Sequence, residues 1–156
     1  MIKVQQVDKN FDGFPALTGL DVNVRKGSIY GLVGTNGAGK TTLIKHVTGV
    51  LRQDRGTITV EDEPVFENRS LKARFGYVPD DLYFFNSYNL SESARFYRSL
   101  YPQWSEERYR QMVKRFGLSE KRKLSKFSKG MQKQASFILA MAGMPDYLVL
   151  DEPIDG

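Results

Sequence analysis

The chain has 156 residues, of which 40% are hydrophobic and 26% charged, and its net charge is +5. This composition is typical of a single globular domain with a buried core. There is no cysteine, which excludes disulfides and thiolate metal sites. No stretch approaches the roughly 20 apolar residues of a membrane span, and the first residues lack the apolar run of a secretory signal. We therefore expect the chain to work in the cytoplasm, where its charge permits an anionic partner without specifying one.

Alternating apolar residues predict strands in the first half of the chain. The alternation covers residues 2–7, 20–24 and 57–61, with a connection at 10–17 between the first two strands. Residues 28–33 form a short apolar run that predicts a buried strand, and residues 41–47 predict a helix directly after a glycine-rich loop. A further short strand is expected at 75–78, where Pro79 ends it.

The second half of the chain is predicted to be mainly helical. Ser91 is expected to cap a helix that runs to about Leu100, and Ser105 to begin a helix that Gly117 ends. A third helix is expected from about Lys129 to Ala142. The apolar residues 147–150 then predict a buried parallel strand with acidic residues at its carboxyl end.

The glycine-rich loop at 34–41 has the sequence G-T-N-G-A-G-K-T, which is the P-loop pattern. Its glycines allow backbone amides to turn toward phosphate oxygens, and the helix that follows adds partial positive charge. Lys40 can reach the β- and γ-phosphates, and Thr41 can offer its hydroxyl to Mg²⁺. A nucleoside triphosphate site is therefore expected at Gly34, Asn36, Gly37, Ala38, Gly39, Lys40, Thr41 and Thr42. The competing interpretation is a glycine-rich turn with a chance lysine.

Two acids follow the predicted strand at 147–150. Asp151 at the strand end is suited to bind Mg²⁺, and Glu152 beside it is suited to accept a proton from the water that attacks the γ-phosphate. Glu152 and Lys40 are thus the expected catalytic residues. The alternative is that the adjacent acids merely end a strand at the surface.

In this order, the motifs resemble those of the nucleotide-binding domain of ABC transporters. Residues 34–42 resemble the Walker A motif of that family, and residues 148–153 resemble its Walker B motif with the trailing glutamate. The resemblance implies an α/β fold, with a P-loop NTPase core, an antiparallel β subdomain and a helical subdomain. It implies ATP and Mg²⁺ as cofactors. It divides the chain into a β-rich P-loop part (1–79), a helical subdomain (80–143), and the Walker B strand with the start of the D-loop (144–156).

The segment before the third helix resembles the signature of the family, which is usually read L-S-G-G-Q. Ser128, Gly130 and Gln132 match it, whereas Lys129 replaces the first glycine. In the family this segment faces the γ-phosphate that the opposite subunit binds, so a second ATP-binding subunit is implied as a partner. An ordinary N-capped helix is the alternative.

Three further features are carried over from the resemblance. Phe11 lies where the family often has an aromatic residue stacked on adenine, although a core phenylalanine is an equal alternative. Asp80 stands where the family has glutamine, and its carboxylate can still bind Mg²⁺. The aromatic segment at 82–85, with Tyr88, lies where the family meets its membrane partner; a satellite core is the alternative.

The resemblance covers the whole chain, but the D-loop only begins at 152–156, and the family's switch histidine has no match. His46, the single histidine, lies on the P-loop helix and is expected to be an ordinary residue. We therefore expect an incomplete domain whose C-terminal part is missing.

The expected function is ATP binding and hydrolysis that drive transport through a transmembrane permease subunit, on the inner face of the cell membrane. One alternative is a soluble ABC-type ATPase that acts on ribosomes or DNA, because the basic residues between 121 and 133 could contact phosphates. We nevertheless expect no nucleic acid, because no interleaved aromatic residues accompany this charge. Another alternative is an inert nucleotide-binding fragment.

Overall fold

The structure is a computed structural model that describes residues 1–85 and 87–152. These residues form two compact units, an N-terminal unit, Met1–Lys72, and a C-terminal unit that begins at Ala73. The division expected from the sequence, after residues 79 and 143, follows motifs rather than contacts and stays a prediction. The start of the D-loop at 153–156 lies outside the described residues.

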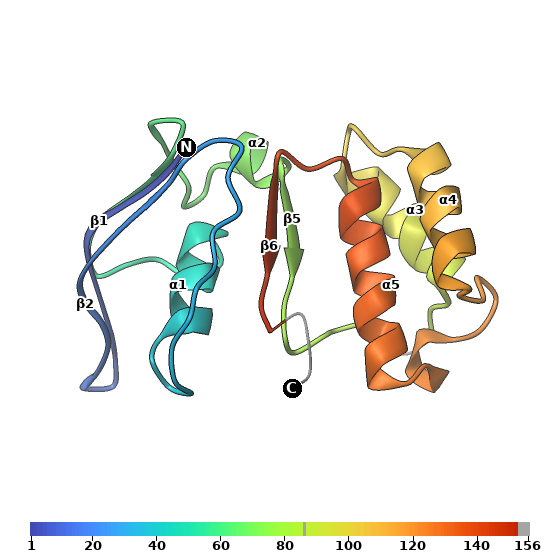
Figure 1. The fold of residues 1–156 in the computed structure, drawn as a ribbon, viewed down its shortest axis with the longest axis horizontal. Helices are drawn as coiled ribbons and strands as arrows, with labels where there is room; N and C mark the ends of the chain where they lie inside the picture. Colours follow the sequence, from blue (N-terminus) through green and yellow to red (C-terminus); the bar gives the residue numbers. More distant parts are fainter. Residues whose placement is uncertain (86, 153–156) are drawn as a thin grey trace. The chain divides into compact units, whose positions relative to one another are not determined.

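The N-terminal unit consists of an antiparallel sheet with one longer helix on one of its faces (Figure 1). The strands lie in the order β2-β1-β3-β4. The core comprises buried side chains of β1, β3 and the helix, among them Val4, Val7, Ile58 and Leu43. The elements are β1 (Ile2–Phe11), β2 (Phe14–Val24), α1 (Lys40–Val47), β3 (Arg55–Val60), β4 (Glu63–Pro64) and α2 (Arg69–Lys72).

The first two strands are longer than the sequence pattern predicts. They run through the expected connection at 10–17 and leave only Asp12 and Gly13 between them. Both residues have positive φ, 49° and 87°, as the tightest hairpin turns require. The Asn10 side chain closes the turn, because its Oδ1 accepts a hydrogen bond of 2.7 Å from the Gly13 amide. The hairpin therefore carries Phe11 and its opposite residue Phe14 at its end.

The strand predicted at 28–33 does not form in the described structure. These residues are exposed, and the exposed fractions of Ile29 and Val33 are 103% and 95%. An isolated extended segment is not a strand, because a strand is held by backbone hydrogen bonds to a neighbouring strand. The N-terminal sheet offers the segment no such partner among its described strands. The segment is apolar, but the prediction that it pairs with a neighbouring strand is wrong.

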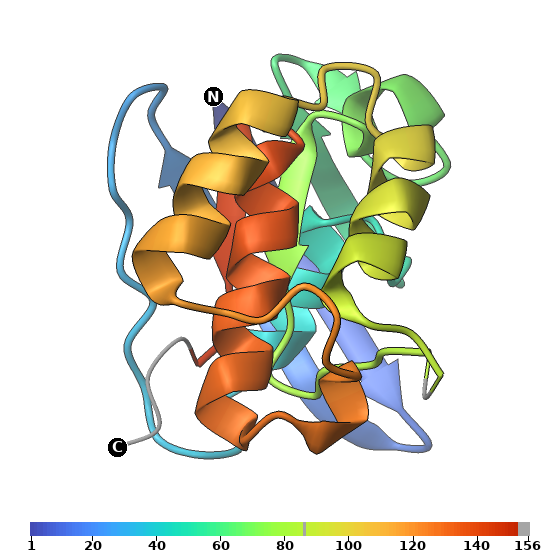
Figure 2. The same cartoon turned by 90° about the vertical axis from the view of Figure 1, so that its right-hand side faces the viewer.

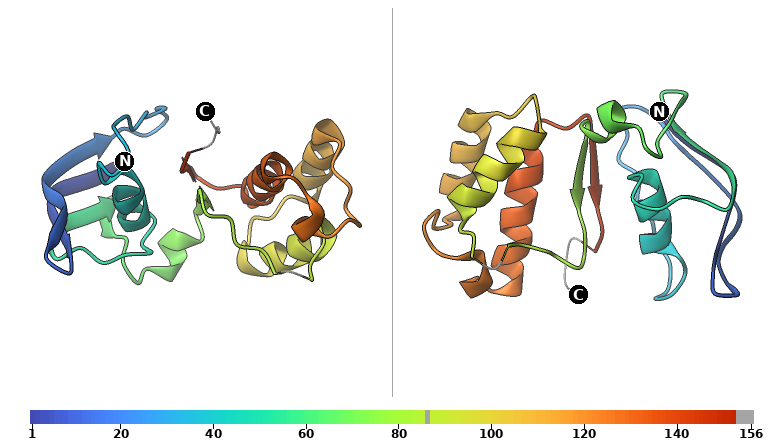
Figure 3. Two further views of the ribbon diagram at one scale, coloured as in Figure 1. Left: turned by 90° about the horizontal axis from the view of Figure 1, so that it is seen from below. Right: turned by 180° about the vertical axis from the view of Figure 1, so that it is seen from behind.

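In the C-terminal unit, the long helix α5 lies between a pair of parallel strands and two further helices (Figures 1 and 3). Figure 2 shows α4 and α5 side by side, with α3 on the other side of α5. The buried cluster between these helices includes Leu90, Val113, Ile138 and Leu139. The elements are β5 (Phe75–Val78), α3 (Leu90–Leu100), α4 (Glu106–Phe116), a 3₁₀ turn (Leu124–Lys126), α5 (Lys129–Ala142) and β6 (Tyr147–Leu150).

Strands β5 and β6 pair in parallel, with Phe75 opposite Tyr147 and Val78 opposite Leu150. A Cβ atom on Gly76 would lie 2.9 Å from Pro145 Cγ, so the absence of a side chain there allows the close packing of this face. The parallel strand predicted at 147–150 is confirmed, and its carboxyl end lies beside that of β5. The predicted burial is wrong, because no residue of β6 is fully buried and Leu148 is 40% exposed.

The helix predicted to begin at Ser91 begins at Leu90 instead. Its N-cap is Asn89, whose side chain accepts from the Glu92 amide at 2.9 Å, while Glu92 accepts from the Asn89 amide at 2.8 Å. Ser91 donates its hydroxyl to the Asn89 side chain at 3.1 Å. This reciprocal capping box satisfies two backbone amides at once, which a serine cap without a partner at N3 cannot do.

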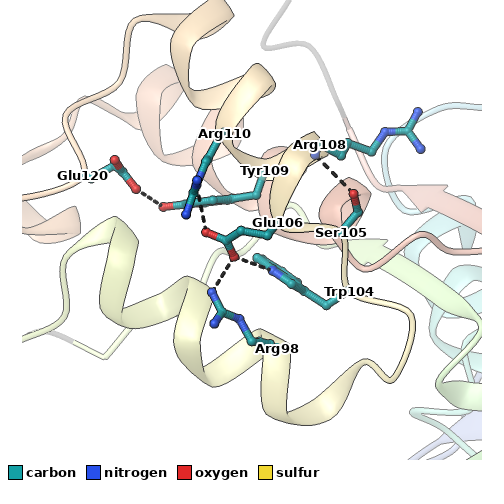
Figure 4. A network of polar contacts seen from close by, with 8 residues as sticks. All are labelled: Arg98, Trp104, Ser105, Glu106, Arg108, Tyr109, Arg110 and Glu120. Carbon is teal, nitrogen blue, oxygen red and sulfur yellow. Dashed lines mark hydrogen bonds and ion pairs between the residues drawn. The ribbon is translucent and has the colours of Figure 1, made fainter.

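A polar network joins α3 to α4 (Figure 4). Glu106 at the start of α4 accepts from Arg98 of α3, and from the indole of Trp104 at 3.2 Å. Tyr109 of the same helix donates to Glu120 at 2.9 Å. Burial raises the pKa of Glu106, but the hydrogen bond from Trp104 and the charges of the two arginines outweigh it, so this pKa lies below its usual value.

Candidate nucleotide-binding site

The phosphate-binding loop lies at the start of α1, as the sequence predicts. Gly39 is the N-cap, with φ of 84°, and no side chain caps the helix. An ideal Cβ on Gly39 would lie 2.6 Å from the Ala16 carbonyl oxygen, so only glycine fits there. Gly37 shares the positive φ, 82°, but lies in open space. The N-terminus of α1 therefore lacks a side-chain cap, and a helix N-terminus after a glycine-rich loop is an arrangement that binds phosphate.

Lys40 folds back over this loop. Its ammonium group donates to the carbonyl oxygens of Gly34, at 2.8 Å, and Thr35, at 3.0 Å. The Thr35 carbonyl also accepts from the Ala38 amide at 3.2 Å, which closes the loop as a turn. The positive charge is thus held at the mouth of the loop, where a phosphate group would meet it.

Phe11 is 41% exposed at the end of the β1–β2 hairpin. The Lys9 ammonium lies 5.3 Å from the centre of its ring. This placement excludes the core phenylalanine that the sequence left open, and it leaves an aromatic face in solvent. His46, in contrast, is buried in α1, where its Nδ1 lies 2.6 Å from the Thr42 carbonyl oxygen. It is a packed residue of the helix, as expected.

The C-terminal unit contributes the acids. Asp151 continues the strand ladder, because its amide donates to the Val78 carbonyl at 2.9 Å, and it is only 3% exposed. Glu152 is exposed and has φ of 46°, which is unusual for a residue with a side chain. Burial, and then the carboxylate of Asp151, raise the pKa of Tyr77 to about 12, so a neutral phenol borders this edge at physiological pH.

Asp80 lies just beyond β5 at the same edge, because Val78 and Leu150 are opposite each other. Its carboxylate pairs with the ammonium of Lys133 at 3.3 Å, and Lys133 also donates to the Glu152 carbonyl at 2.9 Å. The sequence did not indicate that Lys133 belongs to this site, and it was grouped with the basic residues between 121 and 133. The pair spans 53 residues, so no local pattern reveals it. The sequence carries one sign of this contact. Asp80 is an acid at a position where the family has a neutral glutamine, and a carboxylate there favours a positively charged partner.

The signature segment forms the start of α5. Ser128 caps the helix by accepting from the Met131 amide at 3.3 Å, and Gly130 is exposed with open space around it. Gln132 turns inward and donates to the Leu124 carbonyl at 3.0 Å. The two small residues are therefore available to a partner in solution, whereas Gln132 fixes the preceding 3₁₀ turn. Their binding role stays a prediction.

The aromatic segment at 82–85 is partly exposed, as an interface with a partner would be, and partly packed, as a satellite core would be. Tyr83 and Phe85 are exposed, 83% and 43%, while Phe84 packs against the helical core. Leu82, Tyr83 and Phe84 also line a shallow groove with Ser125 and Gln132. The basic residues nearby, Lys121, Arg122, Lys123, Lys126 and Lys129, are exposed, so all but Lys133 form a solvated face. Absence of nucleic-acid binding stays a prediction.

The predicted cofactors fit the donors present. Mg²⁺ prefers hard oxygen ligands and is usually held by one or two carboxylates together with substrate phosphates, not by a cage of protein groups. Among the described residues, no three His, Asp or Glu side chains gather as a ready metal site. The hydroxyl of Thr41 and the carboxylate of Asp151 are suitable oxygen donors, and the glycine cradle before α1 suits phosphate.

Comparison with known families decides the class of protein. The model of the ABC transporter family matches residues 17–155. The chain belongs to this family. ABC transporter ATP-binding protein YtrB of Bacillus subtilis is 31% identical over 156 residues, covering all of this chain and 53% of YtrB. The chain thus spans about half the length of such curated ABC relatives.

Solved structures of ABC proteins share the fold. One, described as the ATP-binding subunit of an ABC transporter, superposes with a TM-score of 0.87 at 25% identity, over 98% of this chain and 66% of that one. Another is cbiO1 from Clostridium perfringens, described as part of the ABC transporter complex cbiONQ. It gives a TM-score of 0.75 at 26% identity, over 97% of this chain and 65% of cbiO1. The predicted α/β ABC fold is therefore confirmed.

Proposed function

We propose that this ABC-family chain binds and hydrolyses ATP to drive transport of a substrate through a separate membrane subunit. The observation that carries the proposal is the loop before α1, where an uncapped helix N-terminus, a glycine whose replacement would bring a side chain against Ala16, and Lys40 occur together. This combination binds phosphate by geometry and by charge.

Within the N-terminal unit, the amides of the loop and Lys40 bind the phosphates. The set of contacting residues is Gly34, Asn36, Gly37, Ala38, Gly39, Lys40, Thr41 and Thr42. The exposed ring of Phe11 stacks on the adenine, which its position at the hairpin end allows. The first turn of α1 has no acidic residue, so nothing there repels the anion.

The resemblance of their motifs makes Thr41 and Asp151 the proposed Mg²⁺ ligands, each with an oxygen donor of the kind that the ion prefers, and the ion would neutralise charge on the phosphates. Asp80 is a third predicted ligand, but in the structure it is engaged with Lys133 and would have to release it. Glu152 accepts the proton of the attacking water. Its side chain is exposed at the end of β6, as a residue that acts on a bound water requires.

A second ATP-binding subunit and a membrane permease complete the proposed assembly. Ser128 and Gly130, exposed at the start of α5, face the nucleotide of the opposite subunit, and Gln132 supports them through the 3₁₀ turn. Exposed Tyr83 and Phe85 contact the permease. No helix of the described residues is long and apolar enough to cross a membrane. The chain would act on the cytoplasmic face of the membrane as a peripheral subunit.

The test separates binding from hydrolysis in the whole protein. Lys40→Ala should weaken Mg·ATP binding by more than about tenfold, because it removes the charge that meets the phosphates. Glu152→Gln should leave binding intact and lower the hydrolysis rate by about a hundredfold or more, as loss of a general base does. Lys45→Ala removes an equal charge at the other end of α1 and is the matched control. Full binding by Lys40→Ala would overturn the proposal.

A further inference from the structure

Lys133 connects three elements of the C-terminal unit. It projects from α5, and its ammonium lies 3.3 Å from Asp80 Oδ1 beyond β5 and 2.9 Å from the Glu152 carbonyl oxygen beyond β6. Its side chain is only 15% exposed, although lysine side chains are usually solvated. An exposed surface ion pair contributes little to stability. An ammonium that is largely removed from water and contacts both the Asp80 carboxylate and the Glu152 carbonyl is fixed in place.

The second acceptor belongs to a residue under strain. Glu152 has a left-handed backbone, with φ of 46°, which a residue with a side chain adopts only when its surroundings hold it there. The direction of its side chain depends on that conformation. Lys133 holds the carbonyl of this same residue, so it contacts the strained peptide directly.

We propose that Lys133 is a positioning residue, held by Asp80, that keeps the Glu152 backbone in the conformation that aims its carboxylate. In this chain, Asp80 then serves as the anchor of Lys133 rather than as a ligand of Mg²⁺. The proposal rests on the proposed role of Glu152 in hydrolysis.

The first experiment measures the rate of amide hydrogen exchange in residues 147–152, on the whole protein without nucleotide. Lys133→Met and Asp80→Asn should each speed exchange in this segment by about tenfold, because both release the strained peptide. Lys114→Met on α4 and Asp81→Asn next to Asp80 remove the same charges from exposed positions, and should leave exchange unchanged. Unchanged exchange in Lys133→Met would overturn the proposal, and this result does not depend on catalysis.

The second experiment measures ATP hydrolysis. Lys133→Met should lower kcat by about tenfold with KM within about twofold, since it misaligns a catalytic group and leaves nucleotide binding intact. Lys133→Arg should recover most of the rate. The double variant with Asp80→Asn should be no slower than Lys133→Met alone, because both changes break one linkage.

Two results would contradict this linkage. Additive losses in the double variant would mean that Asp80 acts independently of Lys133. A higher Mg²⁺ requirement for nucleotide binding in Asp80→Asn, absent in Lys133→Met, would make Asp80 a metal ligand instead. If the unmodified protein fails to hydrolyse ATP, the proposed function fails, while the exchange experiment still decides the role of Lys133.

Discussion

Gly37 and Gly39 of the phosphate-binding loop share one backbone conformation in different surroundings. Alanine at Gly37 meets only the strain of positive φ, so Gly37→Ala should lower the free energy of unfolding by about 1 kcal/mol. Gly39→Ala adds a collision with the Ala16 carbonyl, 2.6 Å away, and should cost about 3 kcal/mol in total. Urea unfolding of both variants measures the difference. Equal losses would show that Ala16 moves aside without cost.

Tyr97 of α3 is a second residue with a measurable individual property. Burial, and then the neighbouring Tyr101, raise its pKa from 10.0 to about 12. The folded state therefore holds the phenolic proton more tightly than the unfolded state does. The stability that this provides is complete below pH 10 and is lost as the pH rises from 10 toward 12.

Tyr97→Phe should flatten that part of the stability curve, while keeping the ring that stacks on Tyr101 at 5.9 Å. Stability measured by denaturant at several pH values between 9 and 12 tests this expectation. A curve with the same slope as that of the unmodified chain would assign the alkaline loss to other groups.

At the scale of elements, Glu106 fastens α4 to α3 through Arg98 (Figure 4). Its folded-state pKa is lowered from 4.5, so its contribution to stability is complete above that value and is lost as the pH falls through the lower, folded value. Glu106→Gln should destabilise the chain at pH 7 and reduce its loss of stability in acid. Glu107→Gln, which removes the adjacent charge without touching α3, should cost less at pH 7. An equal cost would contradict the role of the inter-helix contact.

Elements with local start and stop signals were predicted well from sequence. Helix α4 begins after Ser105 and ends at Gly117 because both signals lie in the chain itself, and α5 follows Ser128 in the same way. The strand at 28–33 was wrongly predicted because pairing depends on a partner elsewhere in the fold. The cap of α3 was misplaced by two residues, because Asn89 and Ser91 are both good caps and only the reciprocal bond with Glu92 chooses between them.

In the candidate site too, features with a local sequence signal were predicted and contacts between distant residues were not. The P-loop, the acids after β6 and the cap at Ser128 are local patterns, and the structure finds each at the expected place on its element. The contact of Lys133 with Asp80 and Glu152 joins three segments and had no local signature. The exposure of Phe11 likewise depends on the length of the hairpin, which the Asp12–Gly13 turn sets.

At the scale of the whole molecule, exposed apolar surface should make the 156-residue chain self-associate. Ile29 and Val33 are fully exposed, and Leu148 of β6 is 40% exposed. Sedimentation velocity over a range of concentrations should show species larger than the 17.8 kDa monomer. Replacing Ile29 and Val33 by lysine should shift the distribution toward the monomer. A strictly monomeric unmodified chain would contradict the expectation.

The parallel pairing of β5 with β6 also sets an order of events during synthesis and folding. Arg74 and Asp146, which flank the pair, are 72 residues apart, and α3, α4 and α5 all lie between them. Helices form from local contacts within microseconds, whereas a pairing this distant must first close a long loop. On the ribosome, the helices emerge before β6 exists. The edge that carries Asp80, Asp151 and Glu152 is consequently the last part of the C-terminal unit to be assembled, and a nascent chain has no Lys133 bridge until that moment.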